Sequence, residues 1–194
     1  MRLFAIDPGP ETCGVVLLDV DEWPPKVLKH RAKMPVEEVL EALRNVRKAP
    51  GGRSIFANFP QVACERVASY NQIAGNEVLQ TCEVFGDIRA TCRDHGIDFT
   101  PIFRREVKMR LGLQVSVGDP EVSTAIRELY PATGGGKKPQ VGIKSKPGPL
   151  YGLSFDAWAA LGVGLAWVLE REREQRAKEL AALKSESAQR GLEL

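Results

Sequence analysis

The sequence is poor in the side chains that bind zinc or perform nucleophilic catalysis. Its 194 residues include two histidines and four cysteines, and no two cysteines have the CxxC spacing. This excludes zinc fingers and His-rich metal sites and disfavours Ser-His-Asp or Cys-His chemistry. The cysteines lie in apolar segments, so we expect all four to be small core residues in a reducing compartment: Cys13, Cys64, Cys82 and Cys92.

Long apolar runs and a strong net charge are also absent. The longest apolar run, from Ala157 to Leu169, is too short to span a bilayer and is followed by charged residues. The amino terminus leads directly into an apolar segment without a signal peptide, so a cytoplasmic location is expected. The formal net charge is only +2. A nucleic-acid partner would therefore be bound by local basic patches, because the chain has no global positive field.

Length and composition are those of one globular domain, with 43% apolar and 27% charged residues. Hydrophobic alternation predicts three successive strands near residues 2–7, 14–19 and 26–31, and helical spacing of apolar residues then begins at Val36. Further strands are expected at 60–67 and 97–103, and further helices at 78–95, 104–110 and 119–130. Three strands followed by a helix indicate an α/β fold whose mixed sheet opens with antiparallel strands.

A single carboxylate stands at the end of the first predicted strand. Asp7 follows a buried apolar segment, and Pro8-Gly9-Pro10 then turns the chain. An unpaired carboxylate in a core costs on the order of several kcal/mol, so Asp7 is expected to contact a metal ion or a phosphate. The alternative is a strand-end aspartate that caps its own turn.

Two further acids occupy comparable positions. The apolar strand at 60–67 ends near Glu65, and two such strand ends side by side would imply a bound cation, because carboxylates do not gather without one. A solvated Glu65 at a strand edge is the alternative, since the sequence does not show that the two ends are adjacent. Asp156 lies in the first turn of an almost wholly apolar helix, with Ser154 as the expected N-cap, and should point towards the edge of the sheet.

Two basic segments are candidates for phosphate contact. One is the helix at 104–110, and the other is a Gly-, Lys- and Pro-rich segment at 131–149 that suits a mobile loop closing on a polyanion. The alternatives are a solvated helix face and a plain disordered insertion. Between these segments, Asp119 is the expected N-cap of a helix with Pro120 at its first position. The basic candidates are Arg104, Arg105, Lys108, Arg110, Lys137, Lys138, Lys144 and Lys146.

Three segments together resemble the RuvC-like Holliday junction resolvases of the ribonuclease H superfamily, and the bacteriophage members most of all. The resemblance covers residues 1–169 and leaves 170–194 as a charged helical extension. It implies a mixed five-stranded sheet flanked by helices, in a protein of a bacterial cell that is encoded by the bacterium or by a phage. The segments are Ile6-Asp7-Pro8-Gly9, Ala63-Cys64-Glu65-Arg66-Val67-Ala68-Ser69-Tyr70, and Asp156-Ala157-Trp158-Ala159-Ala160-Leu161, the last preceded by Gly148-Pro149-Leu150-Tyr151-Gly152.

The resemblance implies that Asp7, Glu65 and Asp156 are catalytic metal ligands of an endodeoxyribonuclease. Members of the family act as homodimers that resolve four-way DNA junctions by paired nicks. Mg²⁺ is the expected cofactor, with Mn²⁺ as a substitute, because both ions prefer hard oxygen ligands. Two ions about 3.5–4 Å apart would bind the scissile phosphate, with Asp7 bridging them. We expect the helix from Val78 to Cys92 to form the dimer interface, because it carries an apolar face beyond the needs of one core.

The chain departs from the bacterial resolvases at two positions. Those proteins carry a further acid or histidine three residues before the last aspartate, where this chain has Leu153. Ser154, Asp119 or a water molecule would have to replace that ligand. They also carry an aromatic residue three positions after the strand-end glutamate, where this chain has Ala68. Tyr70, two residues further on, is the aromatic candidate for DNA contact.

Other functions are compatible with the same pattern. One is a junction- or branched-DNA-binding protein with weak or no cleavage, and another is a nuclease for flaps or replication forks. A third is an actin-like ATPase or sugar-kinase domain, whose opening strand and glycine turn also carry an acid. The third is disfavoured, because those folds need two such domains and this chain has the length of one.

Overall fold

Five strands form one mixed sheet in the order β3-β2-β1-β4-β5. The structure is a computed structural model that describes residues 1–46, 61–67 and 75–191, with side chains through residue 184. β1 is antiparallel to β2, and β2 to β3, whereas β1, β4 and β5 run parallel, so the predicted sheet with its first three strands antiparallel is confirmed. The strands are β1 (Arg2–Asp7), β2 (Thr12–Asp19), β3 (Lys26–Pro35), β4 (Gln61–Arg66) and β5 (Asp98–Phe103).

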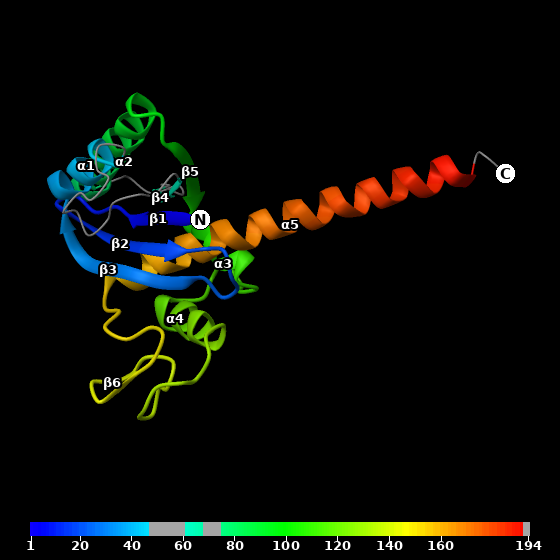
Figure 1. Ribbon diagram of the computed structural model, residues 1–194. Coiled ribbons are helices and arrows are strands. Elements are labelled where there is room, and N and C mark those ends of the chain that lie inside the picture. Colours follow the sequence, from blue (N-terminus) through cyan, green and yellow to red (C-terminus); the bar gives the residue numbers. More distant parts are fainter. Residues whose placement is uncertain (47–60, 68–74, 192–194) are drawn as a thin grey trace.

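Helices cover both faces of this sheet (Figure 1). α1 and α2 pack on one face, and α5, with α3 and α4 against it, packs on the other. A short hairpin of β6 (Gly142–Ile143) and β7 (Lys146–Pro147) lies in the connection between α4 and α5. The helices of the described residues are α1 (Val36–Arg44), α2 (Asn76–Asp94), α3 (Arg104–Arg110), α4 (Asp119–Glu128) and α5 (Asp156–Gly191).

Alternation along the central strands divides the apolar side chains between two cores. Leu3 and Leu18 belong to the core beneath α5, whereas Phe4 and Leu17 belong to the core beneath α1 and α2. Successive side chains of a strand point to opposite faces of the sheet. Because both faces are covered, both sets of positions are apolar, and β1 therefore contains no polar residue between Leu3 and Ile6.

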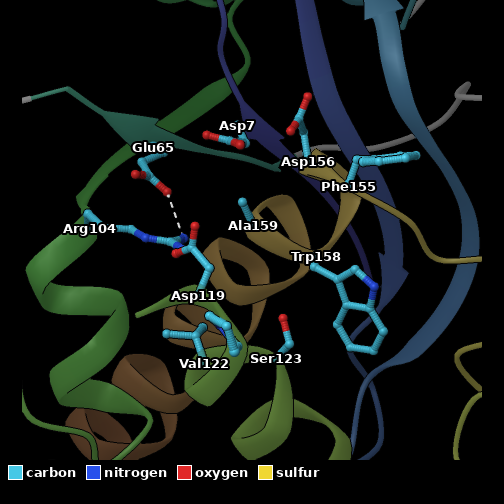
Figure 2. Close-up of a pocket in the computed structure, with 11 residues that line it drawn as sticks. Asp7, Glu65, Arg104, Asp119, Val122, Ser123, Phe155, Asp156, Trp158 and Ala159 are labelled. Atoms are coloured by element: carbon cyan, nitrogen blue, oxygen red, sulfur yellow. Dashed lines mark hydrogen bonds and ion pairs between the residues drawn. The ribbon is translucent and has the colours of Figure 1, made fainter. Parts of the chain in front are cut away.

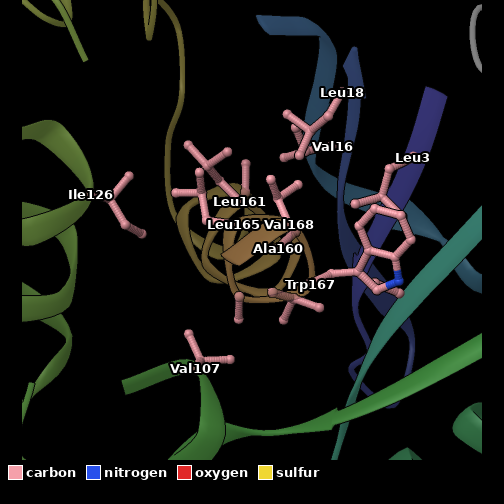
Figure 3. Packing of buried hydrophobic residues seen from close by; sticks show 14 of the residues in the cluster. Leu3, Val16, Leu18, Val107, Ile126, Ala160, Leu161, Leu165, Trp167 and Val168 are labelled. Atoms are coloured by element: carbon pink, nitrogen blue, oxygen red, sulfur yellow. The ribbon is translucent and has the colours of Figure 1, made fainter. Parts of the chain in front are cut away.

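α5 is the central element of the larger core. Residues Ala160–Val168 are buried around the whole helix, as predicted, and Figure 3 shows strand residues such as Leu3 on one side and Ile126 of α4 on another. Gly164 permits the close approach to the sheet, because a Cβ at this position would lie 2.5 Å from a methyl carbon of Leu18. None of the helices in the described ranges combines the length and the apolar character needed to cross a membrane.

The second half of α5 extends away from the domain (Figure 1). The predicted boundary between residues 1–169 and 170–194 falls inside this continuous helix. The first residues after the boundary still contact the domain: Arg110 Nε lies 3.2 Å from Glu170 Oε2, and the guanidinium carbon of Arg171 lies 4.6 Å from the ring centroid of Trp167. The division into a domain and an extension stays a prediction.

The face of α2 that packs on the sheet does not include Cys82. The expectation that Cys82 is a core residue is wrong, because its side chain is exposed, as is that of Leu79. The other three cysteines are buried. Apolar residues occur on more than one side of this helix, so their spacing does not identify the side that packs. The buried residues are Thr81, Val84, Ile88 and Cys92.

Two helices begin away from their predicted caps. α4 begins at Asp119 itself, with Gly118 as its N-cap, so Asp119 is not the cap residue. α5 begins at Asp156 and is directly preceded by Phe155, so Ser154 is not the cap residue either. The carboxylate of Asp119 instead accepts a hydrogen bond from Arg104 of α3.

The Gly-, Lys- and Pro-rich segment 131–149 is folded on itself. β6 and β7 close a hairpin, and the backbone N–H groups of Gly134 and Gly135 donate to the carbonyl oxygens of Pro139 and Lys146, each at 2.8 Å. Glycine is required at Gly142, whose φ is +78° and where a Cβ would lie 2.3 Å from a backbone nitrogen. The alternative of a plain disordered insertion is therefore wrong.

Candidate active site

The three acids identified in the sequence line one pocket (Figure 2). Asp7 ends β1, Glu65 lies near the end of β4, and Asp156 is the first residue of α5. The pocket has a volume of about 570 Å³ and is also lined by Arg104, Asp119, Pro120, Val122, Ser123, Phe155, Trp158 and Ala159. The structure thus brings together residues that are more than 50 positions apart in the sequence.

Strand register places Asp7 beside Glu65. β1 and β4 run parallel with Ile6 opposite Cys64, and the next residue of each strand is an acid. The carboxyl ends of parallel strands meet at one edge of a sheet, which is the edge where α/β proteins commonly bind ligands. β1 and its acid, Asp7, are therefore adjacent to β4 and Glu65. The sequence suggests this adjacency but does not show it.

Gly14 allows Asp156 to reach the same edge. It is paired with Asp7 across β1 and β2. A Cβ at Gly14 would lie 2.3 Å from the backbone carbonyl oxygen of Asp156, so only glycine lets the start of α5 approach the strand this closely. Asp156 consequently enters the pocket from the side opposite to Glu65, with Asp7 on the strand between them (Figure 2).

Burial dominates the electrostatics of the pocket. Burial is the largest of the causes that raise the pKa of Asp7 to about 8. The negative charge of Glu65 also raises this pKa, and the positive charge of Arg104 lowers it. The Glu65 side chain is only 15% exposed, and burial raises its pKa as well, against the opposing effect of Arg104. Carboxyl groups in such a setting are either protonated or neutralised by a cation.

Arg104 links two acids of the pocket. Its Nη1 lies 3.4 Å from Glu65 Oε2, and its Nη2 donates to the carboxylate of Asp119. Arg104 is the first residue of α3, directly after β5, and the parallel pairing of β4 with β5 brings it to the same sheet edge as Glu65. The sequence predicts Arg104 only as a phosphate contact and does not reveal this ion pair.

Asp119 is a fourth acid at the pocket, contributed by α4. Its side chain is 81% exposed, and among the three replacements considered for the family's missing ligand it is the residue that lines the pocket. Ser154 does not line it, and Leu153 at the family's position is buried in the core. Asp119 is therefore the acid that lines the pocket from α4.

The donor chemistry of the pocket fits a hard divalent cation. Carboxylate oxygens are the ligands that Mg²⁺ and Mn²⁺ prefer, and buried carboxyls with raised pKa values favour a neighbouring positive charge. In the ranges that the structure describes, however, no group of three or more His, Cys, Asp or Glu side chains is arranged so that it could hold a metal ion without rearrangement. Arg104 forms an ion pair with Glu65 in this arrangement.

The other basic candidates have different surroundings. Lys108 Nζ donates to a backbone carbonyl at 2.9 Å, Arg110 forms ion pairs with two glutamates, and Arg105 is exposed on α3. Tyr70 lies outside the described residues. The four lysines of the 131–149 segment are exposed: Lys137, Lys138, Lys144 and Lys146.

Phe155 is a pocket residue that the sequence analysis does not identify. It lies at the rim beside Asp156, and its ring points away from Asp7 and Glu65 (Figure 2). Trp158, one turn further along α5, is partly buried, and its indole N–H donates to the carbonyl oxygen of Leu153 at 3.2 Å. An aromatic residue next to a helix-opening acid is too weak a sequence signal to distinguish a surface role from a core role.

The structure is similar to solved structures of a bacterial resolvase. It matches Thermus thermophilus RuvC with a TM-score of 0.58 and 19% identity, covering 90% of this chain and 97% of that chain. It also matches T. thermophilus RuvC in complex with a Holliday junction substrate, with a TM-score of 0.58, 17% identity and coverages of 89% and 96%. No protein-family model matches the sequence, and no curated protein is significantly similar to it.

The likeness carried by three short sequence segments thus extends to the whole domain. The match covers 90% of this chain, whose central sheet has the order β3-β2-β1-β4-β5. The chain therefore has the fold of the RuvC structures that it matches.

Proposed function

We propose that this protein is a metal-dependent, structure-selective endodeoxyribonuclease that resolves four-way DNA junctions by paired nicks. The observation that carries the proposal is the convergence of Asp7, Glu65 and Asp156 on one pocket in a chain with this fold. One of the similar structures holds a Holliday junction substrate, which supports branched DNA as the substrate class.

Asp7, Glu65 and Asp156 would hold Mg²⁺, or Mn²⁺ in its place. When bound, the metal would supply an activated water and neutralise charge on the scissile phosphate. Asp7 has a pKa of about 8 and must lose its proton to act as a ligand, so metal binding releases protons from this site.

Arg104 would exchange Glu65 for a DNA phosphate. Its planar guanidinium group donates to phosphate as readily as to carboxylate, often through two parallel hydrogen bonds. Release from Glu65 frees that carboxylate for a cation, while the ion pair with Asp119 keeps the guanidinium inside the pocket. Glu65 and Arg104 would thus change partners together when DNA and metal arrive.

The exposed lysines around β6 and β7 extend the positive surface available to DNA. Lys137, Lys138, Lys144 and Lys146 are unburied, and with Arg105, Lys108 and Arg110 they are the candidates for backbone contact. Paired nicks also require two active sites. A homodimer through α2 is supported by the exposed side chains of Leu79 and Cys82 on that helix.

A junction-binding protein without efficient cleavage is the second candidate. One observation favours it: among the described residues, no group of three or more ligand side chains is arranged so that it could hold a metal ion. Both candidates predict junction binding, and they differ in what divalent metal does.

Incubation of labelled DNA with and without Mg²⁺ tests the proposal. The substrates are a four-way junction, a replication fork, a flap and a linear duplex of matched sequence. We expect symmetric nicks in the four-way junction that require Mg²⁺, and little cutting of the linear duplex. A retarded but uncut junction would favour the binding protein, and preferential cutting of forks or flaps would change the substrate class.

A further inference from the structure

Phe155 is more exposed than any other large apolar side chain that the structure describes. Its side chain is 78% accessible to solvent, although it stands at the rim of the pocket directly before Asp156. Figure 2 shows the ring projecting outwards from the start of α5. An exposed phenylalanine contributes little to the core, so packing does not explain its presence.

The backbone at Phe155 is in the left-handed region. Its φ is +43°, and no other non-glycine residue in the described ranges has a positive φ. This conformation is unfavourable for residues with a Cβ, and such strain concentrates at functional sites when the surroundings enforce it. Phe155 therefore combines an unfavourable backbone conformation with a highly exposed side chain.

Hydrogen bonds on both sides enforce this conformation. The backbone N–H of Ala157 donates to the carbonyl oxygen of Ser154 at 3.1 Å, and that of Trp158 donates to the carbonyl oxygen of Phe155 at 3.0 Å. Leu153 and Ala157, which flank the turn, are both buried. The turn thus holds the aromatic ring at a fixed place next to a proposed metal ligand.

We propose that Phe155 stacks on a nucleobase of branched DNA next to the scissile phosphate. The proposal rests on the function proposed above and adds a residue that selects the substrate. Aromatic rings stack on any base, and such a contact is sequence-tolerant. Bases at a branch point lack one stacking neighbour, whereas those inside a linear duplex are covered on both faces. Phe155 would therefore favour junctions over duplex DNA.

The surroundings support a DNA base as the occupant. The segment that ends in Phe155 also carries the exposed aromatic ring of Tyr151, and it directly follows the four exposed lysines of the hairpin region. Exposed aromatic rings together with basic side chains are the means by which proteins bind unpaired nucleotides. An apolar protein partner would have no evident use for the adjoining charges.

The test uses substitutions that relieve the strain while removing the ring. Glycine adopts a φ of +43° freely, and asparagine tolerates it, so Phe155→Gly and Phe155→Asn should fold with an unchanged or higher melting temperature. Phe155→Trp keeps the stacking surface. Trp23→Ala is the matched control, because Trp23 is an exposed aromatic residue in the β2–β3 connection, at the sheet end opposite to Asp7.

The readout is the fluorescence of 2-aminopurine placed beside the branch point of a four-way junction, titrated with the full-length protein without divalent metal. We expect Phe155→Gly and Phe155→Asn to lose most of the fluorescence change and about tenfold in preference for junction over duplex. The Phe155→Trp and Trp23→Ala variants should behave as wild type.

Three outcomes would overturn the inference. If wild type binds and cuts junctions but Phe155→Gly gives the same fluorescence and the same preference, the stacking role is wrong and the proposed function stands. If wild type neither binds nor cuts junctions, both fail. If the variant instead changes the sedimentation coefficient of the DNA-free protein, Phe155 belongs to a protein contact.

Discussion

Arg104 and Glu65 form an ion pair at 3.4 Å within a pocket that holds three other acids. The guanidinium group also contacts Asp119, so it is shared between a nearly buried carboxylate and an exposed one. The positive charge offsets part of the repulsion among the acids. It also competes with any cation for Glu65. Substitution of Arg104 therefore tests whether this charge neutralises the acids of the pocket.

Replacing Arg104 with glutamine should destabilise the metal-free protein. Glu65 would lose its charged partner while remaining 15% exposed, at a cost of about 1–2 kcal/mol after allowance for partial solvation. Added Mg²⁺ or Mn²⁺ should recover much of this loss, because the ion replaces the missing charge. Denaturant unfolding in EDTA and in metal measures both effects.

Arg93→Gln is the matched control, since Arg93 forms an exposed pair with Asp94 on the surface. Its loss should change the free energy of unfolding by well under about 1 kcal/mol. Equal effects of the two substitutions would show that Arg104 does not neutralise the pocket.

The stability of the metal-free protein should fall as the pH rises. The pKa of Asp7 is about 8 in the folded state, against an ordinary value near 3.8. Between these values the folded state binds a proton that the unfolded state has released, so the free energy of unfolding decreases by on the order of 1 kcal/mol per pH unit. Unfolding in EDTA between pH 5 and pH 8 measures the slope.

Asp7→Asn is the reference for this slope, because asparagine does not titrate. We expect the variant to lose less stability than wild type across the same pH range. Saturating Mg²⁺ should flatten the wild-type profile at its alkaline end, because the ion binds the ionised carboxylate. Identical slopes for the two proteins would contradict the raised pKa.

Gly14→Ala should displace Asp156 from the pocket. The added Cβ would lie 2.3 Å from the backbone carbonyl oxygen of Asp156, so the start of α5 must move away from β2. We expect loss of metal-dependent cleavage together with a stability loss of about 1–3 kcal/mol, typical of overpacking. Gly75→Ala, directly before α2 and outside the proposed dimer interface, is the control, because a Cβ there has open space. Full cleavage by Gly14→Ala would show that the position of Asp156 is not critical.

Neutralising the hairpin lysines should weaken DNA binding without changing substrate choice. The quadruple substitution of Lys137, Lys138, Lys144 and Lys146 with glutamine removes four exposed charges. If each contacts one phosphate, the slope of log K against log salt should decrease by about 0.9 per lysine. Lys26→Gln, at the sheet end opposite to the pocket, should leave affinity and slope unchanged. An unchanged slope in the quadruple variant would mean that the DNA follows another surface.

The architecture is largely predictable from this sequence, because β1 and β2 are apolar on both faces and residues Ala160–Val168 of α5 are buried all round. A sheet whose central strands are apolar on both faces must be covered by helices on both sides. The convergence of Asp7, Glu65 and Asp156 follows once the register of parallel strands is known, but register is a long-range property that periodicity does not contain.

Other features depend on contacts that local patterns cannot encode. The pair between Arg104 and Asp119 arises because α3 and α4 flank the same pocket, and either residue alone reads as a surface charge or a cap. The left-handed backbone of Phe155 is enforced by hydrogen bonds of its neighbours. The exposure of Cys82 reflects which side of α2 the sheet accepts.

The central claim is that the carboxylates of this pocket bind metal for DNA cleavage and do not merely stabilise the fold. The most direct measurement compares wild type and Asp7→Asn for cleavage of a labelled four-way junction in Mg²⁺ and for binding to the same junction in EDTA. We predict that Asp7→Asn abolishes cleavage, keeps its junction affinity and folds at least as stably as wild type, because it removes a buried acid. Cleavage at the wild-type rate, or loss of binding together with cleavage, would contradict the account.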